Sequence, residues 1–221
     1  MIDAQRGADA VRKICSEYDI KTVMVFGGEP LLHPEAVRLI MSEARKMNVP
    51  RRQIITNGYF TRDREKMREI AFMLSEAGVN DLLLSIDAFH QETIPLDRVM
   101  SFAAEIKAVG LPMRLQPAWL VSEDNDNVYN RKTREILDAF SNMQIPVSEG
   151  NIVFPEGNAL KYLSEYFAED IPKNPYTEDP RNVKCVSFEP NGDTLGGNIY
   201  ENDVMEIICR YTPSGAVSDC P

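Results

Sequence analysis

Residues 21–46 read KTVMVFGGEPLLHPEAVRLIMSEARK, and this stretch decides the fold class. The short apolar run at 22–26 predicts a buried strand that enters a glycine pair, and apolar residues at helical spacing over 34–46 predict an amphipathic helix. Alternating strands and helices of this kind predict parallel βαβ crossovers, and therefore an α/β fold, either a barrel or a doubly wound sheet. The same pattern predicts further strands at 53–56, 81–86, 113–116 and 150–154, and further helices at 5–18, 63–77, 96–109 and 129–143.

The chain is long enough for one domain with a small appendage. Residues 1–168 form the predicted main domain, and the proline- and charge-rich stretch 169–182 predicts a linker. In the remaining extension, which ends at residue 221, we expect a hairpin that turns at Asn191-Gly192 and a short helix over 201–211. Together, 169–221 are interpreted as a linker and C-terminal extension.

The charge and hydropathy of the chain limit the classes of partner that it can bind. A formal net charge of −10 argues against a nucleic acid as partner, because like charges remove the electrostatic attraction that dominates such binding. No apolar run approaches the roughly 20 residues that span a bilayer, and the first ten residues lack the apolar core of a signal peptide. We therefore expect a cytoplasmic protein that binds a small molecule and not a membrane.

Glycines and small polar residues follow each predicted strand. Gly27-Gly28-Glu29-Pro30 follows the first, Asn57 the second, Asp87 the third and Gly157 the fifth, while Gln116 ends the fourth. In parallel α/β folds, ligands bind at the carboxyl ends of the strands. These residues are therefore candidates for one binding site, although each also has a structural interpretation: a glycine turn, an Asn-Gly turn or a helix cap at Asp87.

Four segments, VMVFGGEPLLHPE, IITNGYF, LLLSIDAFHQETIP and IVFPEGNA, are similar in order and spacing to the strand-end motifs of radical S-adenosylmethionine (radical SAM) enzymes. The likeness covers about residues 5–160 and implies a partial (β/α) barrel. In that family the cofactor is cleaved reductively to a 5′-deoxyadenosyl radical that abstracts hydrogen from a substrate. The resemblance implies a cofactor site in which Gly27, Gly28, Glu29 and Pro30 contact the methionyl amino group, Ser85 and Asp87 the ribose, Arg114 and Gln116 the carboxylate side, and Pro155 to Gly157 the adenine.

The sequence departs from the family in its cysteines. The family resemblance implies a CxxxCxxC loop that holds a 4Fe–4S cluster, and this chain has only four scattered cysteines, at positions 15, 185, 209 and 220. We therefore expect a chain that is N-terminally truncated, missing the first barrel strand and the cluster loop. The cluster is expected only in the full-length parent, and no metal site is predicted here. His90, in the loop after the third strand, either reaches a substrate or is a solvated loop residue.

Two functions remain open at this point. The first is a radical SAM enzyme domain that holds the cofactor pocket and acts on an unknown small-molecule substrate. The second is a non-catalytic or degenerate binding module. A different nucleotide-binding α/β fold is disfavoured, because no strand is followed by GxGxxG or GxxxxGK[ST]. A missing first strand would leave a bare sheet edge, so we expect either a homodimer through that edge or poor solubility.

Overall fold

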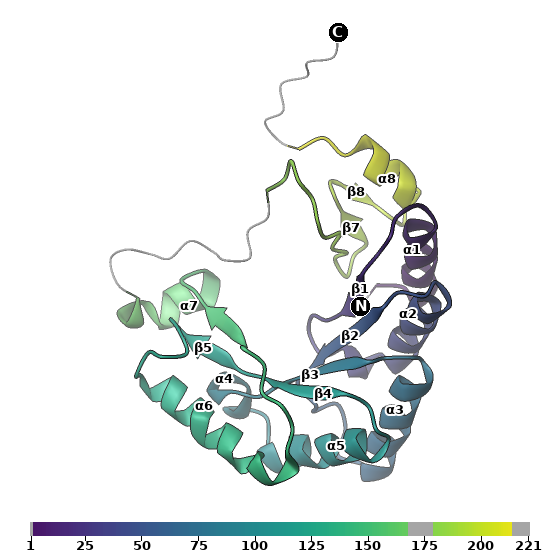
Figure 1. The fold of residues 1–221 in the computed structure, drawn as a ribbon. Helices are drawn as coiled ribbons and strands as arrows, with labels where there is room; N and C mark the ends of the chain where they lie inside the picture. Colours follow the sequence, from purple (N-terminus) through teal and green to yellow (C-terminus); the bar gives the residue numbers. More distant parts are fainter. Residues whose placement is uncertain (1, 168–178, 214–221) are drawn as a thin grey trace.

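A computed structural model describes residues 2–167 and 179–213 of the chain (Figure 1). The predicted helices and strands of the main part are all present, and the short elements α4, β5 and α7 are additions that the periodicity does not predict. In chain order the elements are α1 (Ala4–Glu17), β1 (Thr22–Val25), the 3-10 helix η1 (Pro30–Leu32), α2 (Pro34–Lys46), β2 (Arg51–Thr56), α3 (Arg64–Glu76), β3 (Asp81–Ser85), α4 (Ala88–Gln91), α5 (Leu96–Ala108), β4 (Met113–Gln116), β5 (Ala118–Leu120), α6 (Val128–Ala139), η2 (Ser141–Met143), β6 (Asn151–Val153), α7 (Gly157–Tyr162) and η3 (Ser164–Tyr166).

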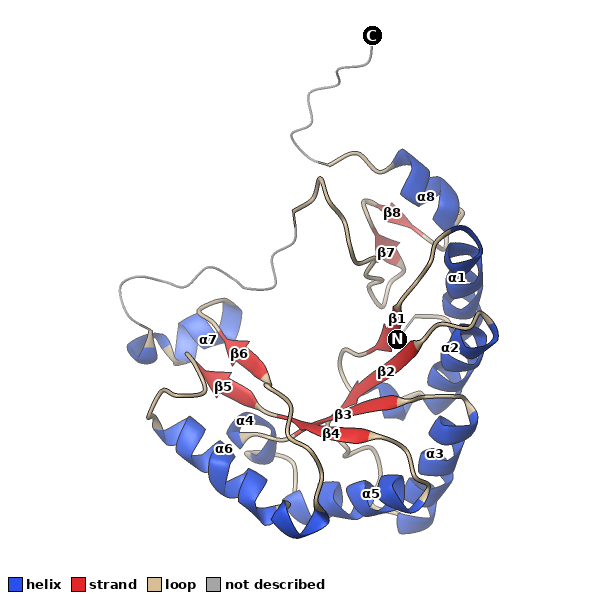
Figure 2. Ribbon diagram, in the orientation of Figure 1, coloured by secondary structure: helices blue, strands red, loops and turns tan. Residues whose placement is uncertain are grey.

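The strands form a curved parallel array. The first four pair in the order β1-β2-β3-β4, and β5 pairs in parallel with β6. In Figure 2 the strands follow an arc, with α2, α3, α5 and α6 along its outer side. The predicted α/β class and the partial barrel of the radical SAM type are confirmed, and the arc of described strands does not close.

A single proline interrupts the strand that follows α5. Its two parts, β4 and β5, are separated only by Pro117, which has no N–H to donate to a β-ladder. The neighbouring strand keeps contact across this break, because Asn151 N–H donates to the Pro117 carbonyl at 2.8 Å and Ser148 N–H donates to the Leu115 carbonyl at 2.9 Å. The predicted strand at 150–154 therefore pairs as β6 with β5, beyond Pro117.

The two faces of the array differ in polarity because successive side chains of a strand point to opposite sides. Ile54, Leu82, Leu84 and Leu115 point to the helices and belong to the main hydrophobic core, with Phe102 of α5 among its fully buried members. On the opposite, concave face the strands carry polar groups: Arg51, Gln53, Asp81, Arg114 and Gln116. This asymmetry places polar chemistry inside the arc.

The C-terminal extension packs on α1. Its β7 (Asp193–Thr194) and β8 (Gly197–Asn198) are antiparallel, and α8 (Val204–Arg210) follows. A small hydrophobic cluster joins Ala10 and Ile14 of α1 to Ile199 and Ile207, and Lys13 pairs with Asp203. The predicted hairpin and short helix are therefore present, and both lie against α1. The predicted boundary at 168–169, most of the predicted linker and Cys220 lie outside the described residues.

The predicted position of the hairpin turn is wrong. The two-residue turn is Leu195-Gly196, in which both residues have positive φ, 45° and 78°. Asn191-Gly192 instead forms a separate turn, in which Gly192 N–H donates to the Glu189 carbonyl at 2.9 Å. Two turns in succession make the ladder shorter than predicted.

Among the described residues, no helix has the length and apolar character needed to cross a membrane. β1 is an edge strand of the array, because among the described strands it pairs with β2 alone. Met24 on β1 and Phe26 just after it are 40% and 60% exposed.

Candidate functional site

The loop after β1 exposes backbone peptide groups. Gly27 and Gly28 have φ values of +91° and +58°, in the left-handed region that glycine adopts at no steric cost. A Cβ at either position would meet nothing within 4 Å. The two peptide units therefore border open space at the carboxyl end of the strand, where a ligand could approach them closely.

Glu29 joins this loop to the loop after β2. Its Oε1 accepts hydrogen bonds from Leu31 N at 2.9 Å and Thr56 Oγ1 at 2.7 Å, and its Oε2 accepts one from Asn57 N at 2.8 Å. Burial raises the pKa of Glu29, and these three hydrogen bonds oppose the rise. The carboxylate is thus a fixed link between two neighbouring strand ends.

Asp87, at the end of β3, is turned inward. Its side chain is 1% exposed, and its Oδ1 accepts hydrogen bonds from Phe89 N and His90 N, both at 3.0 Å. These contacts make it the N-cap of α4, the structural role that the sequence left open. The other oxygen, Oδ2, lies 2.8 Å from His90 Nδ1.

His90 is the titratable group of α4 that reaches solvent. Its side chain is 38% exposed. The hydrogen bond to Asp87 raises the pKa of His90, burial lowers it, and the charges of Asp87 and Glu29 raise it further. The net effect is a raised pKa, so a larger fraction of the imidazole is protonated at neutral pH than in a free histidine. The charge of Glu29 acts on His90 although the two residues belong to different strand-end loops.

Ser85 and Gln116 lie side by side on the concave face. They are register partners on β3 and β4, and each is 8% exposed. Gln116 Oε1 lies 2.5 Å from Ser148 Oγ, which also donates to the Leu115 carbonyl at 3.0 Å. The amide oxygen is thus held in place on the side of β4 that faces β6.

Arg114 belongs to a different group of contacts. Its Nη2 lies 2.7 Å from Asp81 Oδ2, and Arg51 Nη2 lies 2.6 Å from the same oxygen. Burial alone would raise the pKa of Asp81, but the hydrogen bonds and charges of Arg114 and Arg51 outweigh it and lower the pKa. Asp81 begins β3, so this ion cluster lies at the amino end of that strand.

The other candidates lie at strand ends. Asn57 uses its Oδ1 to accept from Tyr59 N at 2.8 Å, within the turn that the sequence suggested. Pro30 begins η1 and is buried. Gly157 begins α7, has φ +52°, and a Cβ there would meet nothing within 4 Å. The contacts therefore link Glu29 to Asn57, and Asp87 to His90, whereas Arg114 pairs toward the opposite end.

A family model described as the Radical SAM superfamily matches residues 2–165, far more than half of the chain. The chain belongs to the radical SAM superfamily. Among curated relatives, a "Probable GTP 3′,8-cyclase" of Saccharolobus islandicus (strain L.S.2.15 / Lassen #1) is 25% identical over 177 residues, which cover 71% of this chain and 52% of that protein. A protein of the same name from Saccharolobus solfataricus is 24% identical over the same shares. This radical SAM chain thus spans about half the length of these relatives.

A solved structure is also similar to this chain. It is the crystal structure of orotidine 5′-phosphate decarboxylase from Pyrococcus horikoshii OT3, with 15% identity and a TM-score of 0.37, covering 77% of this chain and 72% of that one. A similarity at this level supports no statement about function.

The strand-end loops of this radical SAM chain fit an amino-acid nucleoside such as S-adenosylmethionine. Gly27 and Gly28 leave room beside their peptide groups. Within the described part of the chain, Gln91 Nε2 is a buried donor without a hydrogen-bond partner, although Gln91 Oε1 accepts from Asp87 N at 2.9 Å. A buried unpaired donor costs free energy unless a ligand or water satisfies it. The backbone amides and carbonyls beside Gly27 and Gly28 are groups that an amino acid can pair with.

The cysteines do not fit an iron–sulfur cluster of the radical SAM type. In the described residues, no group of three or more His, Cys, Asp or Glu side chains could hold a metal ion. Cys15 lies on α1, where burial raises the pKa of its thiol and so disfavours the thiolate that a cluster needs. Cys185 and Cys209 are exposed in the C-terminal extension. We derive no chemical step through a cluster from these residues.

Sequence reasoning missed residues that hold the site together. Thr56, the last residue of the predicted second strand, is not among the candidates, yet its hydroxyl donates to Glu29. Thr133 of α6 accepts from Ala88 N at 3.0 Å and ties α4 to the neighbouring helix. The signal for Thr56 was present, because it precedes Asn57-Gly58 at a strand end. Nothing local marks Thr133, whose partner lies 45 residues away.

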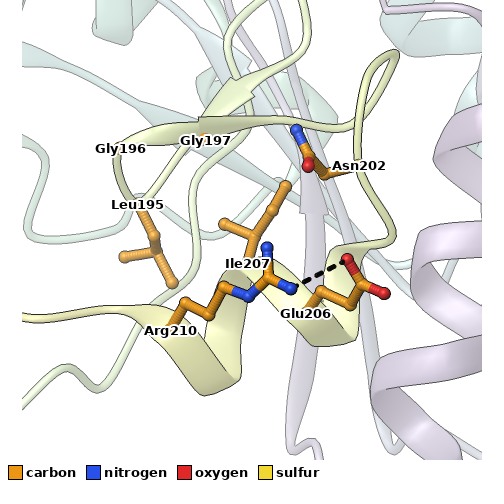
Figure 3. A pocket seen from close by; sticks show the side chains of 7 residues that line it. All are labelled: Leu195, Gly196, Gly197, Asn202, Glu206, Ile207 and Arg210. Atoms are coloured by element: carbon orange, nitrogen blue, oxygen red, sulfur yellow. Dashed lines mark ion pairs between the residues drawn. The ribbon is translucent and has the colours of Figure 1, made fainter.

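A surface pocket lies elsewhere, in the C-terminal extension (Figure 3). It is lined by the Leu195-Gly196 turn, Gly197 and α8, where Arg210 pairs with Glu206 at 3.8 Å. All its lining residues follow residue 194, so it shares none with the strand-end loops. We assign it no part in the candidate site.

Proposed function

We propose that the strand-end loops of this radical SAM domain bind S-adenosylmethionine. When bound in this superfamily, that cofactor supplies a 5′-deoxyadenosyl radical for hydrogen abstraction from a substrate. One observation carries the proposal: Gly27 and Gly28 border open space. The next residue, Glu29, is held by hydrogen bonds to the end of β2 and the loop that follows it. The peptide groups of these glycines pair with the methionyl amino group, while Ser85 and Gln116 lie further along the same rim.

The substrate is proposed to be a small molecule, in keeping with the net charge of −10. The curated relatives are named for a reaction of GTP, and a phosphorylated nucleoside is one candidate substrate class that this relationship suggests. Arg114, proposed to lie near the carboxylate side, requires release from its pairing with Asp81 to contact a ligand directly.

The alternative is a non-catalytic binding module, favoured by the absence of a CxxxCxxC triplet from the sequence. Isothermal titration calorimetry with S-adenosylmethionine and S-adenosylhomocysteine tests the binding that both enzyme and binding module require. Binding of either ligand supports the proposed site. Absence of binding to both refutes it and favours a scaffold or interaction protein.

A matched glycine pair sharpens the test. Gly28→Ala places a Cβ in the proposed ligand space at φ +58°, and Gly110→Ala places one in open space at φ +67°, after α5. Both substitutions carry similar backbone strain, about 1 kcal/mol or more. We expect Gly28→Ala to weaken binding by about tenfold or more and Gly110→Ala to leave it unchanged. Equal effects of the two would refute the placement of the ligand at Gly28.

The bare edge of β1 is proposed to pair with a second copy of the chain. Unpaired strand edges with apolar flanks favour strand addition, and Met24 and Phe26 are exposed beside this edge. Size-exclusion chromatography at two concentrations should show a dimer that dissociates on dilution, and Met24→Lys should shift it toward monomer. A monomer at both concentrations would contradict this proposal without affecting the cofactor site.

A further inference from the structure

The carboxylate of Asp87 is fully committed inside the protein. It accepts three hydrogen bonds, two from backbone N–H groups of α4 and one from the His90 ring, and its side chain is 1% exposed. The Asp87 N–H is also used, since it donates to Gln91 Oε1. An acidic residue with this burial has no free face for a ribose hydroxyl. Asp87 instead acts on His90, because its Oδ2 accepts a hydrogen bond from the His90 ring and raises the pKa of His90.

The imidazole of His90 is held by one nitrogen and open at the other. Nδ1 lies 2.8 Å from Asp87 Oδ2, so this nitrogen carries a proton in both charge states, and Nε2 gains or loses one on titration. With 38% of the side chain exposed, the ring borders solvent at the rim. Among the described residues, no hydrogen bond to Nε2 is seen.

The surroundings of His90 favour its cationic form. Asp87 from the β3 end and Glu29 from the β1 loop are the charged groups that act on it, and both raise the pKa of His90. On the α6 side the contacts of α4 are uncharged: Thr133 Oγ1 accepts from Ala88 N, and Tyr129 stacks on Phe89 with ring centroids 4.9 Å apart. The imidazolium is therefore favoured by two carboxylates: Asp87, which contacts the ring, and Glu29, in the loop of the proposed methionyl position.

We propose that His90 is the residue of the α4 loop that contacts the cofactor, and that its protonated Nε2 donates to the methionyl carboxylate while Asp87 positions the ring. This inference rests on the proposed function. Glu29 and Asp87 carry one negative charge each, and His90 carries one positive charge, so the group has a net charge of −1 before a ligand arrives. The ammonium and sulfonium of the cofactor exceed its one carboxylate by one positive charge. The net charges of this group of residues and of the ligand are thus opposite. In this arrangement the His90 imidazolium pairs with the methionyl carboxylate.

The carboxylate contact makes binding depend on pH in a particular way. Charge-assisted hydrogen bonds are roughly twice as strong as neutral ones. His90→Gln keeps a side-chain N–H donor but removes the titratable charge, so it should weaken binding of S-adenosylhomocysteine by about tenfold near pH 6. The ratio between variant and wild type should shrink as the pH rises through the pKa of His90. Comparison at equal pH cancels the titration of the ligand amino group.

Two histidines in the whole chain allow a direct spectroscopic check. In proton NMR, the Cε1–H signals of His33 and His90 are assigned with His33→Gln, which also serves as the control for binding. Asp87→Asn retains an oxygen for the backbone donors of α4 and should lower the pKa of His90. Addition of S-adenosylhomocysteine should shift the His90 signal and raise its pKa further, while His33→Gln binds like wild type.

The outcomes separate the two proposals. If wild type binds neither S-adenosylmethionine nor S-adenosylhomocysteine, the proposed function fails and this inference falls with it. If wild type binds, but His90→Gln binds equally well or is weaker by the same factor from pH 5.5 to 8.5, the role of His90 is refuted and the cofactor site stands. An unchanged His90 pKa in Asp87→Asn would refute the positioning role of Asp87.

Discussion

Glu29→Gln should destabilise the protein by removing an acceptor that three part-buried donors share. Gln can present its amide oxygen to Leu31 N and Thr56 Oγ1, as Oε1 of Glu29 does now. Its Nε2 then faces Asn57 N–H, which is 2.8 Å from Glu29 Oε2. Two donors cannot pair, so the backbone N–H of Asn57 loses its partner. An unsatisfied buried donor costs about 1–3 kcal/mol, and loss of the charge weakens the other two bonds.

We therefore expect Glu29→Gln to lower the free energy of unfolding by about 2 kcal/mol. Urea unfolding followed by circular dichroism measures this, with Glu35→Gln as the control. Glu35 lies in the first turn of α2 and pairs with Arg38 on the surface, so we expect no measurable change there. A double-mutant cycle with Thr56→Val should show a coupling of about 1 kcal/mol. A loss below about 0.5 kcal/mol for Glu29→Gln would refute the view that this carboxylate links the two loops.

Two further substitutions test other polar groups that make several hydrogen bonds. Asp81→Asn removes the carboxylate that Arg51 and Arg114 share. The two arginines lower the pKa of Asp81. The stability that this ion cluster contributes is therefore fully present above the unfolded-state pKa of Asp81, about 3.9, and is lost as the pH falls through the lower pKa of the folded state. The difference in unfolding free energy between wild type and variant should therefore disappear in acid, and a constant difference at all pH values would contradict this assignment. Asn130→Ala removes the hydrogen bonds that Asn130 makes to the Leu120 N–H and to the Ser122 and Asn125 carbonyls. We therefore expect a loss of about 3 kcal/mol in urea unfolding, and a loss below about 1 kcal/mol would show that water replaces the amide.

Hydrophobic periodicity was sufficient to predict the main α/β framework, because most strands and helices bury one continuous apolar face. β2, β3 and α2 lie within two residues of their predicted positions. The three-residue β5 was not predictable in this way, since Pro117 interrupts the pattern and the strand is defined by pairing with β6, more than 30 residues away. Long-range pairing of this kind leaves no local signal.

Turn chemistry gave a mixed result in the C-terminal extension. Asn-Gly is the strongest local signal for a hairpin turn, and it does form a turn at Asn191-Gly192. The ladder closes instead at Leu195-Gly196, where Leu195 takes φ +45°. Packing of Gly197 against Ile207 helps to explain this choice, because a Cβ at Gly197 would lie 2.8 Å from the Ile207 side chain. Close approach to α8 thus fixes which residues form the strand.

The strand-end rule could not give the direction of the candidate side chains. Asp87 follows β3 as predicted, and whether a residue there caps the next helix or faces a ligand depends on α4, a helix too short for periodicity to reveal. Arg114 was expected at the ligand rim, two residues from Gln116. Its length lets it reach Asp81, and a half-buried carboxylate at that distance attracts the guanidinium more strongly than open solvent does.

Substitution of a residue that positions the loops should lower both the unfolding free energy and the ligand affinity, whereas substitution of a residue that only contacts the ligand should lower mainly the affinity. Glu29 holds two loops by three bonds, so Glu29→Gln should lower both the unfolding free energy and the affinity for S-adenosylhomocysteine. His90 has a partly exposed ring, and Asp87 keeps its two backbone donors without it. His90→Gln should therefore lower affinity with a much smaller change in unfolding free energy. Unequal losses in the two variants would distinguish loop positioning from ligand contact, and proportional losses in both would mean that binding merely follows the stability of the rim.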